Sequence, residues 1–115
     1  MKIEGLGDFE MVPQVVIDLN EGNMCALDLA YQNGLNINEN VVLHEYISEK
    51  PLTLALMMNN FDSVRWLVEH GANLNDKKSP SFLKAVRYCD ESTIHYLVKN
   101  GADIHAVDRL NTLNP

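Results

Sequence analysis

The sequence predicts an all-α protein, a solenoid of about three helix-turn-helix repeats. First, residues 66–75 return in similar form at residues 96–105, and the glycines of the two copies, Gly71 and Gly101, lie 30 residues apart. Second, apolar residues recur at helical spacing before each of these glycines. Third, prolines stand where the helices are expected to begin. Since one helix pair cannot bury its own apolar face, the repeated pairs are expected to stack on one another.

The first unit is degenerate and spans about residues 12–38. Pro13 precedes the apolar residues 14–17 and is expected at the first turn of a helix, where a missing N–H costs little. Gly22 marks the turn to a second helix, and Gly34 marks the end of that helix because glycine readily adopts the left-handed conformation.

The next two units, residues 50–76 and 80–106, follow the pattern more closely. Each begins at a proline, Pro51 or Pro80, followed by a short helix, a turn and a second helix that ends at a glycine. Residues 107–115 are expected to begin a further repeat, since Asn114-Pro115 is a typical helix start. The chain is therefore expected to be the N-terminal piece of a longer array.

These units resemble the ankyrin repeat, which opens with the pattern Thr-Pro-Leu-His-x-Ala and closes with Gly-Ala-Asp-x-Asn. Residues 51–55 match the opening, and residues 71–75 and 101–105 match the close. The resemblance covers roughly residues 12–115 and is strongest over residues 50–105. It implies a single domain made of stacked helix pairs.

Several positions depart from that family pattern. The opening histidine is replaced by Thr53 and Leu83, so its hydrogen bonds between repeats are not expected here. The glycine of the mid-repeat turn is replaced by Asn59 and Cys89. Asparagine tolerates the left-handed conformation fairly well, whereas cysteine does not.

Resemblance to ankyrin arrays also implies a non-enzymatic role, binding a protein partner through the concave face of the first helices and through the loop tips. Methionine, tyrosine and arginine are typical of interface cores. For Met57 and Met58, packing against a neighbouring repeat is the alternative. By alignment, the expected binding residues on the first helices are Asn20, Glu21, Met57, Met58, Arg87 and Tyr88. The loop tips are expected to add Glu45, Tyr46, Lys77 and Lys78.

The first loop between repeats, residues 38–50, is longer than usual and carries apolar residues of its own, including Val41, Leu43 and Ile47. Two explanations of its length stay open. The loop either forms a short helix that caps the stack or binds the partner.

The net charge of −7 is concentrated in residues 1–50, which hold nine acids and two lysines. Such an acidic half repels nucleic acid and anionic membranes, so neither is an expected partner. It would attract a basic protein, which makes an inhibitor or immunity-type protein that masks a basic toxin or enzyme surface an alternative function. A merely solubilising acidic face is the plain alternative. A capping segment of a longer ankyrin scaffold is a third reading, and the oligomeric state stays open.

No catalytic, metal or cofactor site is expected. His44-Glu45 lacks the second histidine of a zinc-protease motif, and Cys89 has no recognisable base and oxyanion loop. His70 is expected to interact with a helix C-terminus, His95 to be exposed, and Trp66 to lie in the core.

The location expected for this chain is the cytoplasm. Its two cysteines are too few for a disulfide scaffold, and no signal peptide or membrane-spanning apolar run is recognisable.

Overall fold

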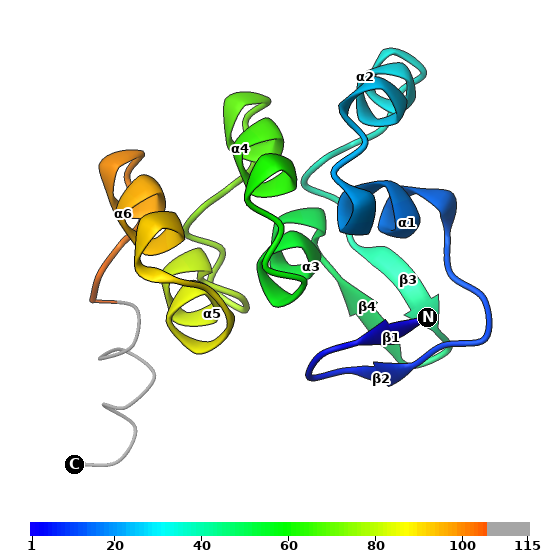
Figure 1. Ribbon diagram of the computed structural model, residues 1–115, viewed down its shortest axis with the longest axis horizontal. Helices are drawn as coiled ribbons and strands as arrows, with labels where there is room; N and C mark the ends of the chain where they lie inside the picture. Colours follow the sequence, from blue (N-terminus) through cyan, green and yellow to red (C-terminus); the bar gives the residue numbers. More distant parts are fainter. Residues whose placement is uncertain (106–115) are drawn as a thin grey trace.

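The structure is a computed structural model, and it describes residues 1–105. Its helices form three consecutive pairs, which confirms the predicted solenoid. Figure 1 shows α1, α3 and α5 as an inner row, beside the hairpins, and α2, α4 and α6 as an outer row. The expected start of a further repeat, at residues 107–115, lies outside the described residues. The helices are α1 (Gln14–Glu21), α2 (Met24–Gln32), α3 (Pro51–Met57), α4 (Phe61–Glu69), α5 (Ser81–Tyr88) and α6 (Glu91–Lys99).

The second helix of every pair begins with the same cap. A side-chain oxygen of the preceding residue accepts a hydrogen bond from the backbone N–H three residues later, which satisfies a donor that the helix leaves unpaired. The capping residues are Asn23, Asn60 and Asp90, with donor–acceptor distances of 3.1, 3.1 and 3.2 Å. Helix α3 instead carries Pro51 in its first turn, as predicted.

The predicted left-handed glycines follow the outer helices. Gly34, Gly71 and Gly101 have φ values of 101, 93 and 104°. In the mid-repeat turns, Asn59 adopts a φ of 53°, whereas Cys89 keeps an extended φ of −116°. The backbone therefore turns differently where cysteine replaces glycine.

Two asparagine side chains connect neighbouring repeats. Asn38 donates from Nδ2 to the carbonyl of Gly71 at 3.1 Å, and Asn75 donates in the same way to the carbonyl of Gly101 at 3.0 Å. The Oδ1 atom of each asparagine accepts the backbone N–H two residues beyond that glycine, at 2.8 Å in both cases. These bonds fix the spacing between successive loops.

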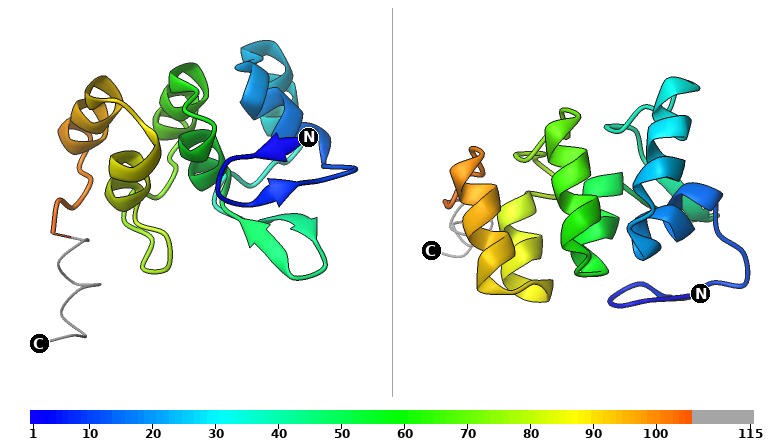
Figure 2. Two further views of the ribbon diagram at one scale, coloured as in Figure 1. Left: turned by 60° about the horizontal axis from the view of Figure 1, so that its bottom comes forward. Right: turned by 45° about the horizontal axis from the view of Figure 1, so that its top comes forward.

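Two short antiparallel hairpins complete the described chain, and the sequence did not predict either one. The first joins β1 (Lys2–Ile3) to β2 (Gly7–Asp8), and the second joins β3 (Val41–His44) to β4 (Ile47–Glu49). Both lie on the side of the inner row (Figure 2).

The capping helix considered for residues 38–50 is wrong, because this segment forms the β3–β4 hairpin. The burial of β3 has the period of two that a strand requires. Leu43 is buried, whereas Val42 and His44 on either side of it are exposed. An alternating pattern of this kind cannot bury one stripe of a helix.

Trp66 lies in the core between α2 and α4, as predicted, and only 4% of it is exposed. Its Nε1 donates to Oδ1 of Asp28 at 2.7 Å. The indole stacks on His70 with the ring centroids 4.0 Å apart, and Tyr31 meets it edge-on. His70 is the C-cap residue of α4, and its Nδ1 lies 2.7 Å from the carbonyl oxygen of Trp66.

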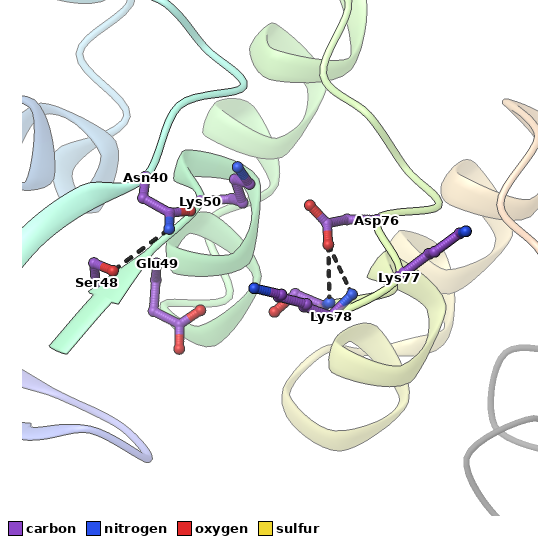
Figure 3. A pocket seen from close by; sticks show the side chains of 8 residues that line it. Asn40, Ser48, Glu49, Lys50, Asp76, Lys77 and Lys78 are labelled. Carbon is purple, nitrogen blue, oxygen red and sulfur yellow. Dashed lines mark hydrogen bonds between the residues drawn. The ribbon is translucent and has the colours of Figure 1, made fainter. Parts of the chain in front are cut away.

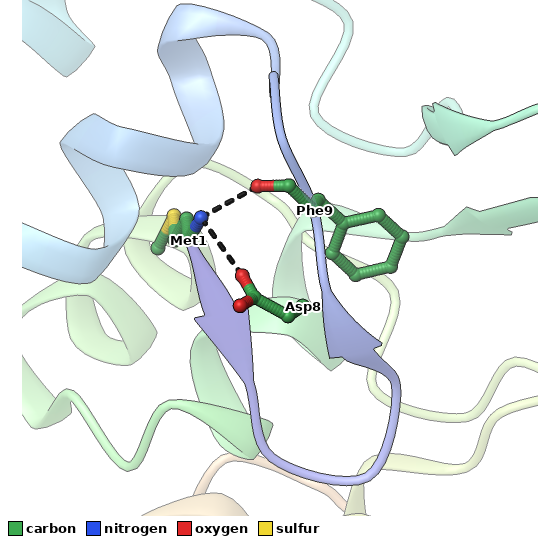
Figure 4. Close-up of polar contacts among 3 residues, drawn as sticks. All are labelled: Met1, Asp8 and Phe9. Atoms are coloured by element: carbon green, nitrogen blue, oxygen red, sulfur yellow. Dashed lines mark hydrogen bonds and ion pairs between the residues drawn. The ribbon is translucent and has the colours of Figure 1, made fainter.

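The N-terminal hairpin is closed by the first residue of the chain. The amino group of Met1 donates to the carbonyl of Phe9 at 2.5 Å and lies 3.2 Å from Oδ1 of Asp8 (Figure 4). Ile3 and Phe9 are buried and belong to the main hydrophobic core. The hairpin is thus packed against the stack and does not stand clear of it.

Candidate partner-binding surface

The inner helices end at the positions where the resemblance places a partner. Arg87 and Glu21 are exposed, and Met58 and Tyr88 are half-buried. These side chains come from the last turns of α1, α3 and α5, which lie in one row (Figure 1). The row offers an arginine, an aromatic ring and a thioether, a combination typical of interface cores.

Met57 is a correction to the predicted set of exposed residues, because it is buried. The turn of the β1–β2 hairpin covers it. A Cβ atom placed on Gly5 would lie 2.9 Å from the terminal carbon of Met57. Met57 is therefore not an exposed contact residue, and it lies against the N-terminal hairpin, whereas the alternative considered for it was packing against a neighbouring repeat.

The β3–β4 hairpin forms the first loop tip, with Glu45 and Tyr46 between its two strands. Both residues are exposed, and Tyr46 is 87% exposed. Val42, on the outer face of β3, is 63% exposed. An apolar tip on a hydrogen-bonded hairpin presents contact area that is already ordered, which lowers the entropic cost of binding.

The second loop tip is tighter and basic. Oδ1 of Asp76 accepts the backbone N–H groups of Lys78 at 2.8 Å and Ser79 at 3.3 Å, and so shapes the turn. Lys77 and Lys78 are exposed, and within residues 1–105 their ammonium groups form no ion pair. Figure 3 shows the Lys78 side chain extending toward β4, while Lys77 extends away from it.

A polar groove of about 520 Å³ separates the two loop tips (Figure 3). Lys50 lies in its wall, with its Nζ held by the carbonyl of Asn38 at 2.8 Å. The sequence pattern missed this groove, because its two walls come from loops in different repeats. One sequence signal could have predicted the groove. The two loops occupy equivalent positions, because each follows a closing Gly-x-Asn motif. The groove is lined by Asn40, Ser48, Glu49, Lys50, Asp76, Lys77, Lys78 and Ser79.

Cys89 has a pKa shift opposite to that of an activated nucleophile. Burial, assisted by the negative charge of Asp90, raises the pKa of the Cys89 thiol to about 11. A reactive cysteine needs the opposite shift. The Cys89 thiol instead donates to the carbonyl of Leu56 at 3.2 Å, which makes it a link between α3 and the third pair. His95 is exposed and lies 3.5 Å from Glu91, as a surface histidine would.

Residues 1–105 contain neither a cluster of metal ligands nor a membrane-spanning helix. No group of three or more histidine, cysteine or acidic side chains in that range could hold a metal ion. Among those same residues, no helix has the length and apolar character needed to cross a membrane.

Comparison with known proteins assigns the chain to a family. A family model described as ankyrin repeats, in three copies, matches residues 7–108. No curated protein matched the chain. The family match spans most of the 115 residues and agrees with the three helix pairs, the glycine-ended outer helices and the inner row described above. The chain belongs to the ankyrin-repeat family.

Proposed function

We propose that this chain is a non-enzymatic module that binds a protein partner through the ends of its inner helices and through its two loop tips. Ankyrin repeats generally act as protein–protein interaction modules, and the family match supports that class of function for this chain. The proposed contact residues are Glu21, Glu45, Tyr46, Met58, Lys77, Arg87 and Tyr88. Met57 would join them only where the N-terminal hairpin moves aside.

One observation carries the proposal. Tyr46 is 87% exposed at the tip of a hydrogen-bonded hairpin, on the same side of the molecule as the inner row that carries Arg87. An exposed tyrosine presents a large apolar ring with a polar tip, which suits a protein interface. Tyrosine and arginine are also the residues most enriched in binding hot spots.

A capture experiment with paired variants tests the surface. The full chain is immobilised and exposed to an extract of its source cells, and retained proteins are identified by mass spectrometry. The test variant carries Tyr46→Ala and Arg87→Ala. The matched control carries Arg65→Ala and His95→Ala, two exposed residues of the outer helices. Circular dichroism and thermal unfolding establish that both variants fold.

The proposal expects one protein to be retained by the wild type and by the outer-helix control but lost by the test variant. Retention by the test variant together with loss by the control would move the binding surface to the outer row. It would therefore contradict the proposal.

A basic partner is favoured by the distribution of exposed charge. Of the nine acids in residues 1–50, seven are exposed, whereas Asp18 is buried and accepts a hydrogen bond from Gln14. This charge would speed association with a basic surface, in the manner of an inhibitor that masks such a surface. Its test is the association rate of the captured partner with the Glu21→Lys, Glu45→Lys variant. The rate should fall at least several-fold at low salt and little at high salt, and an unchanged rate would contradict a basic partner.

A further inference from the structure

The N-terminal hairpin lies on the same inner face that the proposed function assigns to a partner. Figures 1 and 2 show β1 and β2 beside the inner helices, on the side away from the outer row. Ile3, which is 1% exposed, and Phe9, which is 7% exposed, anchor the hairpin in the common core. A segment of the chain itself thus covers part of the inner face.

The turn of the hairpin contacts two of the residues that the resemblance marks for binding, Met57 and Tyr88. Gly5 has a φ of 86°, which few other residues adopt. A Cβ atom there would overlap the hydroxyl of Tyr88 in α5 and lie 2.9 Å from the terminal carbon of Met57 in α3. The positive φ favours glycine at this point, and a Cβ there would force the side-chain ends of Tyr88 and Met57 to shift.

The hairpin has few stabilising interactions of its own. Each of its strands contains two residues, and a lone two-stranded hairpin is marginally stable at best in water. In the connection from Phe9 to α1, Met11 is 84% exposed, whereas Val12 is half-buried and packs against the core. The helix pairs supply most of the buried residues of the common core, among them Leu54, Leu56 and Leu67, each 0% exposed.

We propose that the β1–β2 hairpin is an intramolecular occupant of the inner face, and that it opens while the helix pairs stay folded. Opening uncovers Met57 and the ring of Tyr88, and a partner then takes the place of the hairpin. The partner segment that fits the uncovered site resembles the hairpin turn that leaves it. That turn has a glycine at positive φ beside an apolar side chain. This inference rests on the proposed use of the inner face for binding.

Opening of this kind would regulate affinity without any change in the contacts to the partner. A partner that binds only the open state shows an affinity reduced in proportion to the fraction of open molecules. A variant whose hairpin cannot dock would therefore bind more tightly than the wild type.

Thiol labelling measures the opening directly and needs no partner. Met57→Cys is made in the full chain with Cys25→Ser, because Cys25 is exposed. The reference is Ala55→Cys in the same background, a position in the same helix that is 0% exposed and belongs to the core of the stack. Labelled sites are identified by mass spectrometry at several low urea concentrations.

The thiol introduced by Met57→Cys should be labelled about 10-fold faster than the thiol introduced by Ala55→Cys, at a rate nearly independent of low urea. Local opening exposes little surface, whereas global unfolding exposes much and depends steeply on denaturant. Equal rates with equal urea dependence would show that the hairpin leaves only when the whole chain unfolds, which would overturn the proposal.

A matched pair of glycine variants gives a second readout. Gly5→Val and Gly7→Val both place a β-branched residue at positive φ, but a Cβ at Gly7 meets nothing within 4 Å. Peroxide oxidation of the native Met57, with exposed Met11 as the internal reference, avoids any cysteine substitution. Met57 should oxidise several-fold faster in Gly5→Val than in Gly7→Val, and identical rates would contradict the role of the turn.

Failure of this inference is distinguishable from failure of the proposed function. A hairpin that never opens leaves the loop tips and Arg87 available to a partner. Loss of capture by the Tyr46→Ala, Arg87→Ala variant would then still support the proposed function.

Discussion

At the scale of single residues, asparagine carries much of the order between repeats. Asn38 and Asn75 each satisfy one carbonyl and one N–H of the following loop, and the closing motif of the repeat supplies these residues. The third copy has His105 at the equivalent position, so the series of asparagines ends there. Backbone groups left unpaired by a loop are costly unless a side chain or water satisfies them.

Asn75→Ala is expected to lower the free energy of unfolding by about 1–2 kcal/mol, because it removes both hydrogen bonds to the next repeat. Asn73→Ala is the matched control. Its side chain accepts only the N–H of Asn75 within its own loop, so the loss should be about 0.5 kcal/mol. Urea unfolding measures both values, and equal losses would contradict a bridging role for Asn75.

The raised pKa of Cys89 predicts how stability depends on alkaline pH. Its folded-state pKa is about 11, above the ordinary value of 9.0, because burial and Asp90 oppose the thiolate. Below pH 9 both states keep the proton. Between about pH 9 and 11 the unfolded chain loses it first, so the free energy of unfolding falls as pH rises. Cys89→Ser should flatten this fall, and an unchanged profile would contradict the assignment.

At the scale of helices and strands, the sequence predicted what depends on short-range pattern. Proline starts and glycine ends are local features, and a proline stands at the start of α1, α3 and α5 while a glycine follows α2, α4 and α6. Pro13 and Pro80 are N-cap residues, one position before the expected first turn. The first hairpin was missed because its apolar residues pack against distant partners. Ile3 and Phe9 are buried against residues far along the chain, and two-residue strands leave almost no periodicity to detect.

The same limit applies to the binding surface. Arg87, predicted by alignment, and Tyr46, predicted from its place in the first loop, are both exposed as expected. Met57 was placed wrongly because its cover comes from Gly5, more than fifty residues earlier in the chain. Likewise, the groove between the loop tips arises only when two repeats stack.

The contact between α2 and α4 depends on one polar bond inside an aromatic cluster. A double-mutant cycle with Trp66→Phe and Asp28→Ala should give a coupling energy of about 1 kcal/mol, because phenylalanine keeps the ring but lacks the Nε1 donor. Circular dichroism in urea provides the four stabilities. A coupling near zero would mean that the bond adds nothing beyond ring packing with Tyr31 and His70.

At the scale of the whole molecule, the distribution of charge lowers the stability of the fold. The net charge of −7 arises entirely in residues 1–50, which form the first helix pair, both hairpins and the loops beside them. Like charges repel in the compact state, and the chain holds few ion pairs that would offset this repulsion within residues 1–105. Such an arrangement is understandable if the charge serves binding and not folding.

Salt should therefore stabilise the free protein. Raising NaCl from about 0.01 M to about 0.3 M shortens the range of the repulsion, and the Tm should rise by a few degrees. The Glu39→Gln, Glu45→Gln variant, which removes two exposed charges, should show a smaller rise. A Tm that falls with salt would mean that attractive pairs dominate the charge distribution.

The central claim, that the inner side of this ankyrin stack binds a protein, is tested most directly by photo-crosslinking in the source cells. A photoreactive amino acid replaces Tyr46, Arg87 or His95 in turn, and all three positions are exposed. The account predicts that one protein is crosslinked from positions 46 and 87 and not from position 95 on the outer helix. Crosslinking from position 95 alone would place the partner on the opposite row and contradict the account.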